Sequence, residues 1–198
     1  PLGVGGAIYL AEYANRSSKI VKAVRLTAET LAGIPSILYG LFGMMFFVTS
    51  LRWSYSLLAG GMTLAVMILP LILRTTEEAL LSVPDSYREG SFGLGAGRLR
   101  TVTHIVLPPA MSGILAGVIL AIGRVVGETA ALIYTAGTVA DWPKGVMSSG
   151  RTLAVHMYVL SGEGLHVSEA SATAVVLLVI VVGMNALSAF AAKKLTRG

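Results

Sequence analysis

The sequence predicts an all-α protein, a polytopic bundle of helices that crosses a membrane several times. Of its 198 residues, 55% are hydrophobic and only 13% are charged, and the mean hydropathy is +0.77. An ordinary soluble domain carries about 25% charged residues. This chain therefore has too little polar sequence for the surface of a soluble enzyme, and we expect most of its length to lie in lipid.

Four apolar stretches are long enough to span a membrane, because about 20 apolar residues cross a hydrocarbon core of roughly 30 Å. A shorter apolar stretch at residues 1–11 fits the second half of a further span. We therefore expect one transmembrane domain over residues 1–198, truncated at its N-terminus. The four predicted spans are Ile34–Leu51, Trp53–Leu73, Ile105–Ala140 and Ala170–Ala192.

Lysine and arginine are unevenly divided between the two sides of this bundle. If the connection before Ile34 lies on one side, the opposite side receives only Arg52, Lys144 and Arg151. Cytoplasmic connections carry the excess of basic residues, so the richer side is cytoplasmic and includes the C-terminus. We interpret the net charge of +5 as a sign of topology rather than of nucleic-acid binding.

Three further segments have recognisable patterns. Residues 19–31 combine apolar positions at helical spacing with charges, as expected for a helix that lies on the membrane surface and enters it near Gly33. The small residues of Gly40–Gly43 and Gly60–Gly61 predict close helix contacts. The external segment 141–169 either dips into the membrane or forms a short lid helix.

The longest cytoplasmic connection, between the second and third predicted spans, has the pattern of an ordered docking element. Pro84 breaks a first helical turn, and Asp85 or Ser86 can cap a second helix. That helix is expected to expose Arg88 and Glu89 and to end in a glycine-rich turn. A short helix of this kind can dock on a partner protein.

This segment resembles the EAA loop of importer-type ABC permeases. In that family a Glu-Ala-Ala start is followed by a glycine and by an Ile-x-Leu-Pro end, although Gly90 and Ser91 replace the alanines here. The resemblance implies a MetI-like permease core, with a coupling segment at about 77–108 that inserts into a groove of an ATP-binding subunit. The residues implied in coupling are Ser86, Tyr87, Arg88, Glu89, Gly95, Ile105, Leu107 and Pro108.

Blocks elsewhere in the chain are similar to the PstA family, one of the two permease subunits of phosphate-specific ABC importers. The resemblance implies a six-span subunit in a bacterial or archaeal inner membrane. It also implies a second permease (PstC-like), a dimer of ATP-binding subunits (PstB-like) and a phosphate-binding protein (PstS-like) as partners. The matching blocks are Ala7–Ala14, Ile34–Ile37 with Tyr39–Gly43, Arg74–Glu77 and Gly123–Ala130.

Two charged residues interrupt the third predicted span. Arg124 lies about 24 Å along a helix from Pro108, inside the bilayer, where an arginine costs about 2.5–3.5 kcal/mol. Glu128 is expected one helical turn further on the same face, close enough to pair with it. The arginine can offer a bidentate contact to an oxyanion in the path, or the pair can lock two helices together. The family resemblance favours the substrate path.

The sequence contains no Gly-x-x-x-x-Gly-Lys-Ser/Thr motif, so we assign ATP hydrolysis to a partner and expect no enzyme activity from this chain. No cofactor or metal site is expected, since there is no cysteine and the histidines lack ligand spacing. The resemblance to the PstA family implies phosphate as the cargo, while sulfate, molybdate and phosphonate also suit an arginine. A secondary anion transporter would not need the coupling motif. An intramembrane hydrolase would need a nucleophile with a base.

Overall fold

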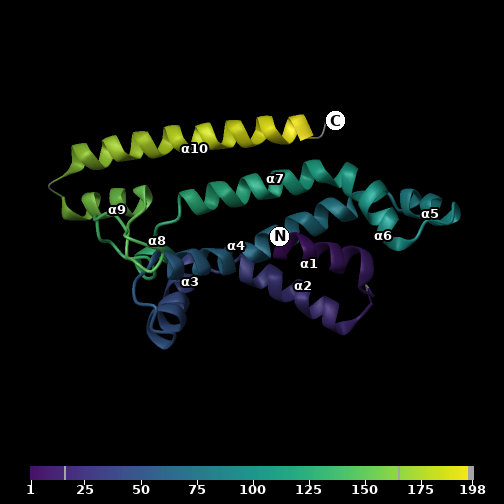
Figure 1. The fold of residues 1–198 in the computed structure, drawn as a ribbon, viewed down its shortest axis with the longest axis horizontal. Helices are drawn as coiled ribbons and strands as arrows, with labels where there is room; N and C mark the ends of the chain where they lie inside the picture. Colours follow the sequence, from purple (N-terminus) through teal and green to yellow (C-terminus); the bar gives the residue numbers. More distant parts are fainter. Residues whose placement is uncertain (16, 165, 196–198) are drawn as a thin grey trace. The chain divides into compact units, whose positions relative to one another are not determined.

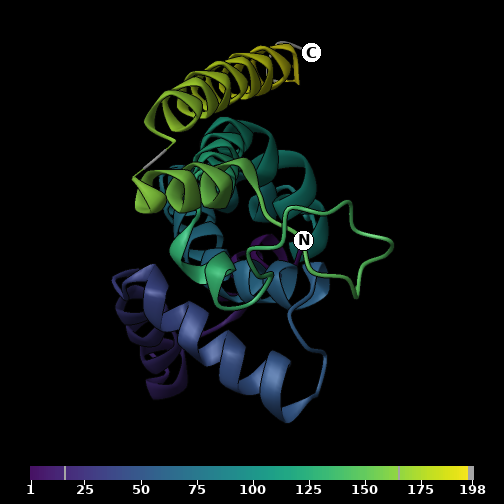
Figure 2. The ribbon, with the colours of Figure 1, turned by 90° about the vertical axis from the view of Figure 1, so that its left-hand side faces the viewer.

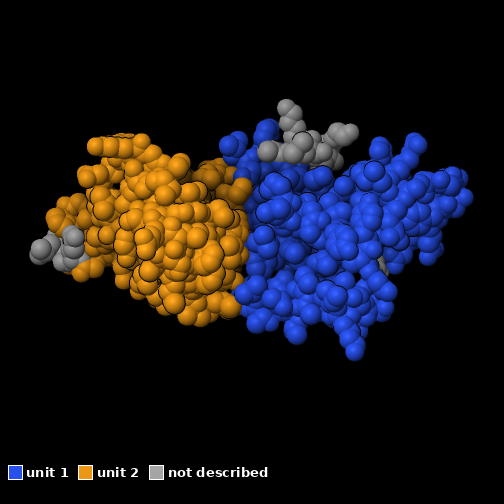
Figure 3. Space-filling model, turned by 60° about the horizontal axis from the view of Figure 1, so that its bottom comes forward, with its two compact units in different colours: residues 1–32, 69–121, 187–198 blue, residues 33–68, 122–186 orange. Residues whose placement is uncertain are grey.

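The computed structural model describes residues 1–15, 17–164 and 166–195, and the regular structure within these ranges is helical (Figure 1). The expectation of an all-α fold is confirmed. The chain divides into two compact units (Figure 3). Unit 1 comprises residues 1–32, 69–121 and 187–198, and unit 2 comprises residues 33–68 and 122–186.

Unit 1 packs around small apolar side chains. Its buried cluster consists largely of alanine, valine and leucine, including Leu80 and Val106. A Cβ added at Gly113 would lie 2.7 Å from the Cβ of Ala79. The helices that carry these residues, Leu107–Val126 and Leu57–Leu81, therefore approach more closely than larger residues would allow. The elements are α1 (Leu2–Ile8), the π-helical η1 (Tyr9–Tyr13), α2 (Lys19–Ala32), the end of α4 (Leu57–Leu81), α5 (Asp85–Gly93), α6 (Arg98–Thr101), the π-helical η3 (Val102–Val106) and most of α7 (Leu107–Val126).

Unit 2 depends on glycine for its closest helix contacts. A Cβ at Gly40 would meet the backbone of Ala131, and one at Gly43 would collide with Thr63. The predicted close contact is also present at Gly60, but a Cβ at Gly61 would meet nothing within 4 Å. The elements are α3 (Ser36–Gly43), the π-helical η2 (Met44–Ser50), the start of α4, the end of α7, α8 (Ala130–Ile133), α9 (Leu153–Glu163) and most of α10 (Val167–Leu195).

Three helices are long and apolar enough to cross a membrane, within the described part of the chain. They are Leu57–Leu81, Arg98–Val126 and Val167–Phe190. The predicted first span, Ile34–Leu51, is shorter than expected, since its helix covers only Ser36–Ser50 and counts as a fourth candidate only when joined to α2.

Two predicted span boundaries are wrong, each for a local backbone reason. The second span begins at Leu57 rather than Trp53, because Arg52 and Ser54 both have φ of 56° and interrupt the helix. The third does not continue to Ala140, since α7 ends at Val126 and the chain leaves helical geometry before α8.

The segment between α8 and α10 contains both an irregular loop and a helix. The loop that precedes α9 is the green connection in Figure 2. In α9, the side-chain oxygen of Thr152 accepts a hydrogen bond from the backbone N–H of Val155 at 3.4 Å. Val155 is fully buried in the core of unit 2. The segment 141–169 thus contains a short helix, α9, that packs on the core of its own unit.

Candidate functional site

The predicted docking helix is present as α5, but its N-terminus is built differently from the expectation. Neither Asp85 nor Ser86 provides a side-chain cap, because the helix starts directly after Pro84. Asp85 is the first helical residue, and its Oδ1 accepts a hydrogen bond from Nη1 of Arg88 at 3.2 Å. The helix ends at Gly93, and Gly95 has a φ of +82°, a left-handed conformation that favours glycine.

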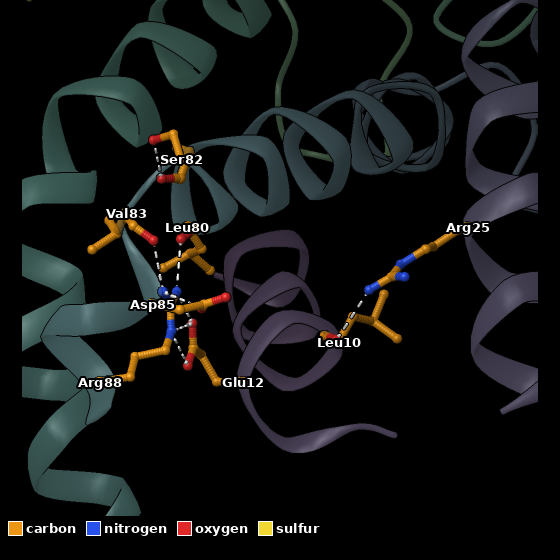
Figure 4. A network of polar contacts seen from close by, with 9 residues as sticks. Leu10, Glu12, Arg25, Leu80, Ser82, Val83, Asp85 and Arg88 are labelled. Carbon is orange, nitrogen blue, oxygen red and sulfur yellow. Dashed lines mark hydrogen bonds and ion pairs between the residues drawn. The ribbon is translucent and has the colours of Figure 1, made fainter. Parts of the chain in front are cut away.

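Arg88 is buried, so the prediction that α5 exposes this residue is wrong. It retains only 8% of its accessible surface. Its Nη2 donates to Oε1 of Glu12 at 2.7 Å and to the carbonyl of Leu80 at 2.8 Å, and its Nη1 donates to the carbonyl of Val83 at 2.7 Å (Figure 4). The Nε donates to both carboxylate oxygens of Glu12. The guanidinium therefore joins α5 to η1 and to the end of α4.

The charge on Arg88 is stabilised by this arrangement. The hydrogen bond to Glu12 is the main cause that raises the pKa of Arg88 above its ordinary value, against the opposing effect of burial. Side-chain exposure is 10% for Arg88 and 6% for Glu12, so water has little access to the pair. This buried ion pair therefore connects α5 to η1 within unit 1.

A second arginine binds the same region of unit 1. Arg25 in α2 contacts Glu77 in α4, with 2.6 Å between Nη2 and Oε1. Its Nη2 also donates to the carbonyl of Leu10 in η1 at 3.4 Å (Figure 4). Arg25 and Arg88 thus approach η1 from two different helices, but only Arg88 belongs to α5.

The outer face of the coupling segment is apolar and open. Glu89 is exposed, as expected, and so are Tyr87, Phe92 and Leu94, the last of which retains 91% of its surface. A groove of about 610 Å³ lies against this face, and four of the expected coupling residues line it: Ser86, Tyr87, Gly95 and Ile105.

The remaining expected coupling residues lie at the start of α7, where Leu107 is half-buried and Pro108 is exposed. Pro108 lies inside the continuous helix Arg98–Val126, just after the π-helical η3. A hydrogen bond of 2.8 Å between the hydroxyls of Ser91 and Thr101 connects α5 to α6.

Arg124 and Glu128 do not form the expected pair. Because α7 ends at Val126, Glu128 lies beyond the helix rather than one turn along its face. Its Oε1 accepts a hydrogen bond from the backbone N–H of Ala131 at 3.1 Å, at the start of α8, and the residue is buried. Among the side chains that the structure describes, Arg124 has no carboxylate within ion-pair distance. It is half-buried in the last turn of α7.

Sequence reasoning missed two features of these sites. The first is the pairing of Arg88 with Glu12, two residues that are 76 positions apart. The second is Asn185 in α10, whose Oδ1 would lie 3.7 Å from a Cβ at Gly123. A single amide in an otherwise apolar span is the signal that could have identified it.

The comparisons with known proteins agree with this architecture. Residues 3–198 match the family described as binding-protein-dependent transport system inner membrane component. The structure is similar to a chain of the MetNI methionine ABC transporter in inward-facing conformations, with a TM-score of 0.79 and 22% identity, over 99% of this chain and 85% of that one. A bacterial ABC transporter involved in the import of alginate gives a TM-score of 0.70 at 15% identity, over 99% of this chain and 73% of that one.

Several curated relatives are similar in sequence. A probable ABC transporter permease protein, YqgI of Bacillus subtilis, is 39% identical over 83% of this chain and 60% of its own length. The phosphate transport system permease protein PstA of Yersinia pestis is 35% identical over 98% of this chain and 66% of its own length. This chain thus spans about three fifths to two thirds of these relatives. It belongs to the family of binding-protein-dependent transport system inner membrane components, the multi-pass permease components of ABC transporters.

Proposed function

We propose that this chain is the permease subunit of an ATP-driven importer and that its cargo is inorganic phosphate. The family supports the importer role, and the similarity to PstA of Yersinia pestis and of Mycobacterium tuberculosis, at 35% and 39% identity, supports phosphate. The observation that carries the proposal is the position of Arg124, a cation in a spanning helix with no carboxylate partner among the described side chains.

The free energy of placing Arg124 in a membrane favours a functional role. An arginine costs about 2.5–3.5 kcal/mol at the centre of a span and less near its end, where Arg124 lies. Its place in the last turn of α7, near the negative end of the helix dipole, recovers only about 0.3–1 kcal/mol. An oxyanion in transit would supply the missing counter-charge, and the planar guanidinium can contact two of its oxygens at once.

Glu128 has a different role in this proposal from the one expected for a paired carboxylate. Because Glu128 holds the start of α8 through the N–H of Ala131, it fixes the chain where α7 ends and does not neutralise Arg124. Removing the carboxylate would therefore alter the shape of the path beside Arg124. A transient anion contact suits transport, since cargo that is bound too tightly would not leave.

The coupling segment would connect the permease to its ATP-binding partner. The exposed Tyr87, Phe92 and Leu94 form an apolar face next to the groove at Gly95, as expected for a surface buried in a complex. In the same proposal a homologous second permease completes the path, and a phosphate-binding protein delivers the anion from the external side.

The test of the cargo is uptake of labelled phosphate by proteoliposomes that contain the full-length protein with its second permease, ATP-binding subunits and binding protein. We expect ATP-dependent phosphate uptake that excess sulfate or molybdate does not reduce. Uptake of another oxyanion would replace the cargo and keep the importer role. Anion uptake that needs no ATP would contradict the importer role itself and favour a secondary transporter.

The test of the coupling segment compares two glycines at the end of α5. Gly95→Ala forces a side chain into a left-handed conformation, which costs about 1–2 kcal/mol, whereas Gly93→Ala introduces no such strain. A Cβ at either position meets nothing within 4 Å, so the two variants differ in the backbone alone. We expect Gly95→Ala to reduce recovery of the ATP-binding subunit with the purified permease, and Gly93→Ala to leave it unchanged. Equal recovery would count against the assignment.

A further inference from the structure

Arg88 connects three segments of unit 1 that are separated along the chain. Its side chain contacts Glu12 in η1 and Asp85 in its own helix. It also donates to the carbonyl of Leu80, in the last turn of α4, and to that of Val83, just after α4. A guanidinium has five N–H donors, and here each one has an acceptor. Arg88 cannot move relative to any of these segments without breaking a hydrogen bond.

The contact with Glu12 joins α5 directly to η1, so that a movement of one helix can reach the other without passing along the polypeptide chain. The two residues are 76 positions apart, and both side chains are almost fully buried. Exclusion of water preserves the electrostatic attraction, which salt would screen at an exposed site. A further polar contact from α5 leads to α6, through Ser91 and Thr101.

We propose that the ion pair between Glu12 and Arg88 makes α5, the end of α4 and η1 move as one body, so that a displacement of α5 is passed directly to the helix formed by α1 and η1. This inference rests on the proposed role of α5 as the segment that docks on an ATP-binding subunit. Arg88 and Glu12 are then positioning residues, which act on transport through α5. Without their contact, α5 would remain tethered by the chain but would tilt independently of η1.

The chain offers a matched control in the pair of Arg25 and Glu77. It is also an arginine–carboxylate contact in unit 1, with 2.6 Å between the charged atoms, and Arg25 also reaches η1 through the carbonyl of Leu10. This pair involves α2 and α4 but not α5. Breaking it should disturb the packing of unit 1 without separating α5 from η1.

The first experiment measures whether α5 and η1 move together in the intact importer. These 198 residues contain no cysteine, so Tyr9→Cys in η1 and Gly93→Cys in α5 would add the only thiols among them, and cysteines elsewhere in the complex would be replaced before spin labelling. Tyr9 is exposed, and a Cβ at Gly93 meets nothing within 4 Å. We expect the same distance between the labels in the nucleotide-free and ATP-bound complex, and a distance that changes with ATP once Arg88→Met is added. A distance that changes with ATP in the complex without Arg88→Met would overturn the proposal.

The second experiment measures the number of anions transported per ATP hydrolysed, which a purely structural role would not change in an assembled complex. For Arg88→Met, and for the milder Glu12→Gln, we expect this ratio to fall, because α5 then moves without η1. Arg25→Met should keep the ratio of the parent protein. An unchanged ratio in Arg88→Met and Glu12→Gln would refute the inference while leaving the importer role intact. Failure of the proposed function itself would be seen separately, as absence of ATP-dependent uptake in the parent protein.

Discussion

The two units differ in the ion pairs between their helices. Both have close helix contacts at glycines, such as Gly113 in unit 1 and Gly43 and Gly60 in unit 2, but in unit 1 arginine–carboxylate pairs also connect the helices. In the described part of unit 2, the only ion pair joins His166, when it is protonated, to Glu169 in the first turn of α10. Those of unit 1 are Arg25–Glu77, Arg74–Glu29, Arg74–Glu78, Arg88–Glu12 and Arg88–Asp85.

The same difference distinguishes Arg88 in unit 1 from Arg124 in unit 2. Arg88 has an acceptor for every N–H of its guanidinium, so its charge is committed to the structure of unit 1. Arg124 lies in a unit held together by small residues and has no carboxylate partner among the described side chains. Under the proposed function, its charge is available to the transported anion. The partners of an arginine, more than its burial, indicate which role it has.

The largest effect on stability is expected for Arg88→Met. The substitution leaves the Glu12 carboxylate buried without its counter-charge, and breaking a buried pair in this way costs about 3–5 kcal/mol. Chemical denaturation of the purified complex in mixed micelles would measure the loss. A loss below about 1 kcal/mol, the value typical of exposed pairs, would remove the contrast between the two arginines.

Arg124→Ala is expected to produce the opposite pattern. Phosphate uptake should fall by about 100-fold, or about 2.7 kcal/mol, in line with the loss of one partner from a buried charge contact. The free energy of unfolding should change by less than about 1 kcal/mol, because no described carboxylate loses a partner. Uptake and denaturation measured on the same preparation would separate the two effects. Normal uptake combined with a large loss of stability would return Arg124 to a structural role.

A smaller effect is expected from Gly43→Ala, which tests the packing of unit 2. Even one methyl group would collide with Thr63, and overpacking of this kind costs typically about 1–3 kcal/mol. The same substitution at Gly61 is the matched control, since a Cβ there meets nothing within 4 Å. Chemical denaturation should show a loss for Gly43→Ala alone. Equal stability of the two variants would mean that glycine contacts do not hold unit 2 together.

Composition and hydropathy were sufficient to predict the class of fold, because an apolar helix can satisfy its backbone inside lipid without help from distant residues. They did not determine where the third span ends. The spacing of Arg124 and Glu128 indicates a pair only if the helix continues between them, and α7 stops at Val126. Glu128 lies four residues after Arg124 whether it pairs with that arginine or accepts a hydrogen bond from the backbone of α8. Local sequence could therefore not distinguish the two arrangements.

The contact between Glu12 and Arg88 could not be predicted for a different reason. Arg88 belongs to a polar helix that looks fully exposed, and its partner lies 76 residues away. Only the tertiary packing of η1 against the end of α4 brings the two together. The break at Pro84 and the glycine-rich turn correctly predicted a short helix that ends before Gly95, but not which of its charged residues faces inward.

The smallest effect is expected for Arg74→Ala, which tests whether every ion pair of unit 1 contributes to stability. Arg74 contacts Glu78 at 2.8 Å and Glu29 at 3.4 Å, but the side chains of all three residues are about half exposed or more. Solvent screens such contacts and long side chains lose entropy when they form them, so their net contribution is small. We expect no measurable change in chemical denaturation at physiological salt. A loss comparable to that of Arg88→Met would show that the number of ion pairs, rather than their burial, stabilises unit 1.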